Sequence, residues 1–175
     1  NTQPIEDTAT TFEELEREFG LSVANIVKEC SDDKSLAKDE RKKQQIEHAA
    51  HASQKAKLVK LADKLYNLSD LLQAPPPSWY IVPDFVSALI EITDESSFRN
   101  AERVQGYFVW SHAVVQRCKG TNEKLEEQLQ RVFDSEFEMK GVKYPALVPE
   151  SQRPDFLEKY YASMAAVKID PFLSS

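Results

Sequence analysis

One stretch near the middle of the chain, KLVKLADKLYNLSDL at residues 57–71, has the clearest pattern of apolar and polar positions. Its apolar residues recur every three or four positions, which is the spacing of one face of an α-helix. The stripe consists of Leu58, Leu61, Ala62, Leu65, Ser69 and Leu72, with Val59 and Tyr66 on one flank and Leu68 on the other. A stripe of this width predicts a largely buried helix.

Two polar residues border this stripe. Asp63 and Asn67 are four positions apart, so they project together beside the edge formed by Val59 and Tyr66, with Asp70 on the same side. A carboxylate and an amide at the rim of a buried helix need partners, and a metal ion or a polar ligand is one possibility. The other is an ordinary solvated flank, as amphipathic helices normally show. Spacing alone leaves both interpretations open.

The rest of the chain also has mainly helical periodicity. Thr11 and Glu14 form the pattern of a capping box for a helix that ends at Gly20, and Ser53 can cap the helix described above. A further helix is expected over residues 21–30, with Val23, Ile26, Val27 and Cys30 on its inward face. Two more are expected over residues 36–50 and 97–119. Thr121 caps the next helix, and a last helix follows a proline-marked linker that begins at about residue 142. Residues 79–92 fit either a short helix or an extended segment.

Composition supports an all-α fold. The 175 residues include only four glycines and few runs of β-branched residues, and the length suits one domain, or one domain with an appendage. A net charge of −7 argues against nucleic acid as a partner, although a local basic cluster could still bind a small anion. The two cysteines, Cys30 and Cys118, do not form a disulfide framework. No stretch suits a membrane span or signal peptide, so a cytoplasmic setting is expected.

Three further features carry possible chemistry. The basic run Arg41 to Lys43 is either a solvated face or an anion contact. His48 and His51 lie one helical turn apart, and His112 lies among apolar neighbours, where packing is the simpler interpretation. The chain begins at Asn1 rather than methionine, which suggests a fragment without its true N-terminus.

Two blocks of sequence resemble a known enzyme family. The first comprises IEDTATTFEELEREFG, VKECSDDKSLAKDERKKQQIEHA and AKLVKLADKLYNL, and the second is RVQGYFVWSHAVVQRCKGTNEKLEEQLQRVF. In this order they resemble the metazoan SpoT homologues, which are HD-domain hydrolases of guanosine 3′,5′-bis(diphosphate), ppGpp. The resemblance covers roughly residues 5–73 and 102–133.

The resemblance implies an all-α HD-type helical bundle that lacks its N-terminal helices. The partial HD hydrolase domain would span residues 1–137, with an insertion at 75–100, and residues 138–175 would form a C-terminal helical extension of unknown role. The implied activity is Mn²⁺-dependent 3′-pyrophosphohydrolysis of (p)ppGpp, which releases pyrophosphate to give GDP or GTP in the response to starvation. The implied partner is a small nucleotide, with no nucleic acid and no membrane; oligomeric state is not implied.

Site residues follow from the same resemblance. Asp63 matches the family's distant metal-ligating aspartate, and Glu6 and Asp7 match the pair that handles the attacking water. Asn67 matches a residue near the bound nucleotide. These residue types suit the chemistry, because a metal held by imidazole and carboxylate lowers the pKa of bound water and a neighbouring carboxylate can accept its proton.

The sequence also departs from the family pattern. The His-Asp dipeptide that ligates the metal would fall at positions 2 and 3, which are Thr2 and Gln3, and the first histidine would lie further upstream. Ser69 replaces a basic residue found after the motif. We therefore expect an incomplete or divergent member of the family, and we expect its activity to be impaired. The alternatives are a catalytically inactive helical scaffold that binds a nucleotide or a protein, and a metal phosphatase for another nucleotide. The resemblance does not support His48 and His51 as replacement ligands, because the family does not use that helix for metal.

Overall fold

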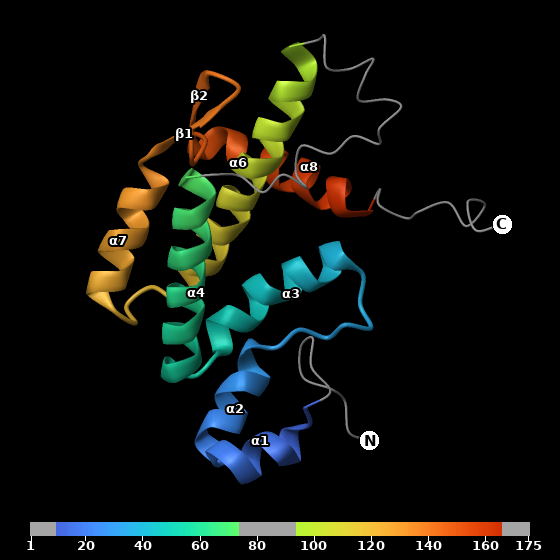
Figure 1. Cartoon of the computed structure of the whole chain (residues 1–175), viewed down its shortest axis with the longest axis vertical. Coiled ribbons are helices and arrows are strands. Elements are labelled where there is room, and N and C mark those ends of the chain that lie inside the picture. The colour runs from blue at the N-terminus through green and yellow to red at the C-terminus, as the bar shows by residue number, and fades with distance from the viewer. Residues whose placement is uncertain (1–9, 74–93, 166–175) are drawn as a thin grey trace, which may run out of the picture.

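The computed structural model describes residues 10–73 and 94–165 (Figure 1). Helices dominate this part of the chain, which confirms the predicted all-α class. In order, the elements are α1 (Phe12–Phe19), α2 (Leu21–Cys30), α3 (Lys38–His51), α4 (Gln54–Gln73), α6 (Asp94–Arg117), α7 (Glu123–Phe133), β1 (Glu136–Met139), β2 (Val142–Pro145), the 3-10 helix η2 (Glu150–Gln152) and α8 (Arg153–Ala165).

The helices pack around α6. In Figure 1, α4 lies beside α6 with α7 along its outer side, α8 crosses α6, and α1 and α2 form a corner at the far end of the molecule. The largest side chains of the core are Trp110 and Phe108 of α6, both fully buried. Leu61 and Leu68 of α4 and Leu129 of α7 pack into the same cluster. Helix α6 is therefore the element against which α3, α4 and α8 pack.

The N-terminal helices follow their sequence signals only in part. The predicted capping box is present, because Thr11 Oγ1 accepts from Glu14 N at 3.2 Å and Glu14 Oε2 accepts from Thr11 N at 2.8 Å. Gly20 then turns the chain into α2 with a φ of 82°. The predicted inward face of α2 is wrong in one respect, because Ala24 is its buried residue and Val23 is 40% exposed. Helix α2 contacts both α1 and α4.

Helix α4 also differs from its prediction. Its fully buried positions include Leu61 and Leu68, but Val59 and Tyr66 are 47% and 74% exposed, so the predicted buried flank faces outward. Lys64 is buried instead, with 7% of its surface exposed. The buried face is therefore rotated towards positions 61, 64, 68 and 71. Hydrophobic pattern alone misplaces it, because the pattern assigns lysine to solvent.

Helix α6 begins and ends within a few residues of its predicted bounds, and its first turns include residues 94–100 of the expected insertion. Residues 74–93, which contain the rest of that segment, lie outside the described residues. The cap of α7 is Asn122 rather than the predicted Thr121, since Asn122 Oδ1 accepts from Leu125 N at 2.9 Å. Asparagine is at least as good a cap as threonine, so the two neighbours compete.

A two-stranded hairpin lies where the sequence predicted the end of a helix and the start of a proline-marked linker. Strands β1 and β2 pair antiparallel, and Lys140 and Gly141 between them have φ values of 51° and 79°. Two consecutive positive φ values are the signature of a tight type I′ turn. The Phe137 ring stacks on Phe108 and on Tyr144, with ring centroids 6.3 and 5.6 Å apart. The hairpin therefore belongs to the core, although its strands are too short for a readable alternation.

Helix α8 approaches α6 closely at Gly106. A Cβ atom placed on Gly106 would lie 2.7 Å from Tyr160 Cβ, which is closer than carbon atoms can pack. Glycine in a helix interior costs about 1 kcal/mol relative to alanine, so this position sacrifices helix propensity for helix packing. Tyr160 is consequently buried at the crossing, with 6% of its surface exposed.

We predict that Gly106→Ala destabilises the protein, although alanine is the better helix former. The new methyl group meets Tyr160 Cβ, which cannot move without shifting α8, and overpacking of this kind costs about 1–3 kcal/mol. The net loss in the free energy of unfolding should be about 1 kcal/mol, measured by urea denaturation. Gln116→Ala on the exposed face of α6 is the control and should change stability by less than about 0.5 kcal/mol. A more stable Gly106→Ala protein would mean that α8 does not pack tightly.

Candidate functional site

Asp63 lies in the wall of a cavity of about 430 Å³. Residues of α4, of α3, of the end of α2 with the loop that follows it, and of α6 line the cavity. Its lining residues are Cys30, Asp32, Lys34, Arg41, Lys42, Gln45, Val59, Lys60, Asp63, Lys64, Asn67, Tyr107 and Val114. The cavity therefore joins the motif of α4 to the basic run of α3.

The two polar residues predicted from α4 lie together and contact each other. Asp63 Oδ1 accepts a hydrogen bond from Asn67 Nδ2 at 2.9 Å, and Asp63 Oδ2 accepts one from Lys64 Nζ at 2.6 Å. The Asp63 side chain is half exposed, whereas that of Lys64 is only 9% exposed. Both carboxylate oxygens of Asp63 are thus held in place by its own helix, and Lys64 and Asn67 are the partners that this carboxylate needs.

Lys64 carries a charge into an apolar region. Its Nζ lies 4.6 Å from the centroid of the Trp110 ring, where the negative face of the indole attracts an ammonium group. Burying a charge is costly without such compensation, and here the Asp63 carboxylate and the Trp110 ring share that role. Sequence reasoning missed Lys64, because a lysine beside an apolar stripe normally points to water.

Lys42 of α3 approaches the same indole. Its Nζ lies 3.5 Å from the Trp110 centroid and 5.5 Å from that of Tyr107, and its backbone oxygen accepts from Trp110 Nε1 at 2.9 Å. Burial lowers the pKa of Lys42 to about 8, and the positive charges of Lys64 and Arg41 add to this while Asp32 and Asp63 oppose it. The basic run of α3 is therefore not a simple solvated face.

Tyr107 and Arg41 complete the polar lining. Burial raises the pKa of Tyr107 to about 12, and the nearby Asp63 carboxylate acts in the same direction, so the phenol stays neutral at physiological pH. Arg41 Nε is buried and has no hydrogen-bond partner within the part of the chain that the structure describes. A buried donor without a partner is unfavourable, and an anionic ligand would satisfy it.

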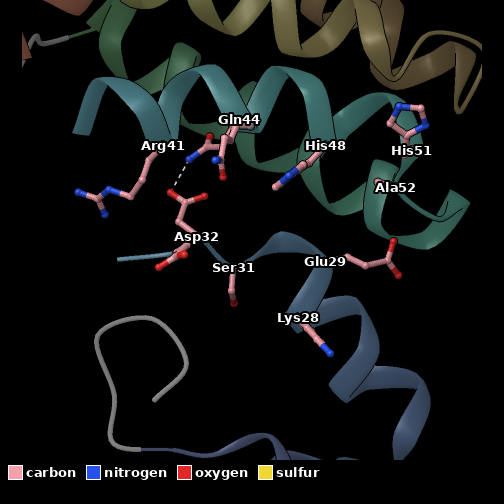
Figure 2. A pocket seen from close by; sticks show the side chains of 11 residues that line it. Lys28, Glu29, Ser31, Asp32, Arg41, Gln44, His48, His51 and Ala52 are labelled. Carbon is pink, nitrogen blue, oxygen red and sulfur yellow. Dashed lines mark hydrogen bonds between the residues drawn. The ribbon is translucent and has the colours of Figure 1, made fainter. Parts of the chain in front are cut away.

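A second cavity of about 360 Å³ lies between the end of α2 and α3 (Figure 2). It shares Asp32, Arg41 and Gln45 with the first. Gln45 Nε2 donates to Asp32 Oδ2 at 2.5 Å, and this hydrogen bond lies at the boundary between the two cavities. His48 and His51 of α3 line the second cavity and not the first.

The described residues do not form a metal centre by themselves. Across residues 10–73 and 94–165, no group of three or more histidine, cysteine, aspartate or glutamate side chains is placed to hold a metal ion. His48 and His51 therefore have no such group around them. Glu6 and Asp7 lie outside the described residues, so their predicted place beside Asp63 stays a prediction.

His112 is packed, as its neighbours suggested. Its ring meets Phe133 edge to face with centroids 5.1 Å apart, and it does not line either of the two cavities. Burial lowers the pKa of His112, the charge of Arg153 lowers it further, and Glu150 opposes both. A neutral imidazole packed on a phenylalanine is a structural residue.

The electrostatics of the first cavity favour an anion. Five basic side chains line it, namely Lys34, Arg41, Lys42, Lys60 and Lys64, against the two carboxylates Asp32 and Asp63. This local excess of positive charge contrasts with the net charge of −7 of the chain. A cavity of this size and charge suits a compact phosphorylated molecule. The helices that the structure describes include none long and apolar enough to cross a membrane.

Comparisons with known proteins agree with this picture. Residues 2–80 match the HD domain family model. The guanosine-3′,5′-bis(diphosphate) 3′-pyrophosphohydrolase MESH1 of Danio rerio is 50% identical over 129 residues, and those of Homo sapiens and Drosophila melanogaster are 45% and 43% identical over 129 residues. Each match covers 74% of this chain and 61% of the relative, so the chain spans about three fifths of the length of these curated relatives.

A solved structure gives the same result for the fold. It is described as a metazoan ortholog of SpoT that hydrolyzes ppGpp and plays a role in starvation responses. It superposes with a TM-score of 0.58 at 43% identity, and the match covers 74% of this chain and 61% of that one. By sequence and by fold, about three quarters of the chain is therefore similar to the metazoan SpoT homologues, and its N-terminal part matches the HD domain.

Proposed function

We propose that the cavity beside Asp63 binds ppGpp. We further propose that the protein is a Mn²⁺-dependent 3′-pyrophosphohydrolase, which releases pyrophosphate from ppGpp and leaves GDP. The observation that carries the proposal is the basic lining, from α3 and α4, around a carboxylate in the LADKLYNL motif. The names of the relatives support the substrate and the reaction. A cytoplasmic setting and a role in starvation are part of the same proposal.

The described residues have separate roles in this proposal. Lys42 and Lys64 are held on Trp110 and neutralise phosphate charge, and Arg41 offers a buried donor to a phosphate oxygen. Asn67 keeps Asp63 oriented and lies where it can contact the nucleotide. Because these groups are already in place, little ordering is needed when the ligand binds.

The metal is proposed to use Asp63 as one ligand, with Glu6 and Asp7 handling the attacking water. A divalent ion lowers the pKa of bound water and offsets charge on phosphoryl oxygens. One carboxylate does not hold such an ion tightly, so we expect weak metal binding and impaired turnover by this chain as given. The Lys64 contact to Asp63 would have to open, and the Trp110 ring would still hold the ammonium group.

A second candidate is a scaffold that binds the nucleotide without hydrolysing it. Two observations on the described residues favour it. These residues form a basic cavity, but they do not include a group of side chains placed to hold a metal ion. Calorimetric titration with ppGpp in the presence of a chelator separates the candidates. Binding without pyrophosphate release on adding Mn²⁺ supports the scaffold, and release supports the hydrolase.

We predict that Asp63→Asn removes the low Mn²⁺-dependent pyrophosphate release expected of this chain, because the amide keeps the shape but loses the charge that binds metal. Asp70→Asn on the same helix is the matched control and should retain activity, since Asp70 does not line the cavity. The measurement is pyrophosphate release from ppGpp at saturating Mn²⁺. If Asp63→Asn turns over at the rate of the unaltered chain, the assignment of Asp63 is wrong.

We also predict that affinity for ppGpp falls as pH rises from 7 to 9. Lys42, with a pKa of about 8, is mostly charged at pH 7 and mostly neutral at pH 9, so its attraction for phosphate is lost over this range. Bound phosphate favours the charged form and moves the loss to somewhat higher pH.

The matched experiment compares two lysine variants by calorimetry across that range. Lys42→Gln should weaken binding at pH 7 by about 10-fold or more, as expected for a lost charge-assisted hydrogen bond, and should flatten the pH profile. Lys124→Gln, on the exposed surface of α7, should leave both unchanged. A profile that keeps its slope in Lys42→Gln would assign the titration to another group.

A further inference from the structure

Helix α8 packs against two walls of the basic cavity without lining the cavity itself. It contacts both α6 and α3, and Figure 1 shows it crossing α6. The HD domain match ends at residue 80, so α8 lies outside that part of the chain. Its tie to α6 is reinforced by Lys159 Nζ, which contacts Glu102 Oε1 at 3.1 Å.

The closest approach of α8 occurs beside a residue of the cavity wall. Gly106 leaves room for Tyr160, and the next residue, Tyr107, lines the cavity. The rings of Tyr160 and Tyr107 meet edge to face with centroids 6.3 Å apart. Gln105, on the other side of Gly106, donates from Nε2 to Pro145 O at 2.9 Å and so holds the hairpin to the same turn.

From Tyr107 the contacts continue to the lysine of α3. The Tyr107 and Trp110 centroids are 5.3 Å apart, and Lys42 Nζ lies over both rings. A second contact runs directly from α8 to α3, where Lys43 Nζ lies 5.3 Å from the Tyr161 centroid. Consecutive lysines of α3 are therefore held from two sides, one through Tyr107 and one by Tyr161.

We propose that α8 is a positioning element for the cavity: Tyr160 fixes Tyr107, and through it Lys42, at the place from which the lysine reaches a phosphorylated ligand. The identity of that ligand as ppGpp rests on the proposed function above. Tyr160 is a positioning residue and not a catalytic one, because it does not line the cavity. Its ring, rather than its hydroxyl group, makes the contact that matters.

Three tyrosine variants test this proposal. Tyr160→Leu removes the ring and should weaken ppGpp binding at pH 7 by about 10-fold, measured by calorimetry. Tyr160→Phe keeps the ring and should bind within about twofold of the parent, as the conservative rescue. Tyr144→Leu is the matched control, because Tyr144 is a partly buried aromatic residue that stacks on Phe137 and does not line the cavity. It should also bind within about twofold.

A second readout needs no ligand. The rate at which an amine-reactive ester acylates Lys42, followed by peptide mass spectrometry across pH, reports the fraction of neutral amine. The groups that surround Lys42 are Arg41, Lys64, Asp32, Asp63 and Tyr107, and they are unchanged in these variants. The midpoint should lie near pH 8 in the parent, in Tyr160→Phe and in Tyr144→Leu, and should move towards 10.5 in Tyr160→Leu as water reaches the ammonium group.

The two readouts separate the two proposals. If the parent does not bind ppGpp, the proposed function fails and the acylation midpoint alone decides the role of α8. If Tyr160→Leu keeps the parent midpoint, or keeps parent affinity in a chain that binds ppGpp, α8 is not a positioning element. An equal effect of Tyr144→Leu would also overturn the role of α8. Should Tyr160→Leu fail to fold, Gly106→Ala displaces α8 without removing its side chains and should produce the same changes.

Discussion

The structure depends on one buried indole that holds two ammonium groups. Lys42 from α3 and Lys64 from α4 both approach the Trp110 ring of α6, at 3.5 and 4.6 Å from its centroid. Two like charges so close together repel each other, and burial adds a further cost. The indole face, the Asp63 carboxylate and the surrounding helix packing offset that cost. Three helices therefore meet where two ammonium groups lie against one ring.

This arrangement couples stability to binding. The fold holds the two ammonium groups close together in spite of their repulsion. An anionic ligand that binds between them relieves this repulsion, so part of the free energy needed to form the site is already supplied by folding. The Trp110 Nε1 bond to the backbone oxygen of Lys42 fixes α3 against α6 independently of the charges. Backbone anchoring and charge placement are thus separate. A lysine of α3 can lose its charge without releasing its helix.

Some features of the fold and of the site could be predicted from the sequence, and others depend on contacts that the local pattern does not contain. The 3.6-residue repeat predicted the helices, and the four-residue spacing of Asp63 and Asn67 predicted that their side chains meet. It did not predict that Lys64 is buried, because the rule that identifies the buried face of a helix assigns lysine to the exposed face. Nor did it predict Lys42, whose partners Tyr107 and Trp110 are more than sixty residues away in sequence. The hairpin was missed because strands of four residues carry too little alternation.

The net charge of the chain and the local charge of the first cavity have opposite signs. Among the acidic residues that the structure describes, most are exposed and none is buried, so water and salt screen their charges within about 10 Å. The lysines at the cavity are partly desolvated, so their fields reach a ligand with less screening. The carboxylates of Asp63 and Asp32 reduce the positive potential of the cavity, but they are fewer than its five basic side chains. A chain whose overall charge repels polyanions can therefore still attract a small anion at this one cavity.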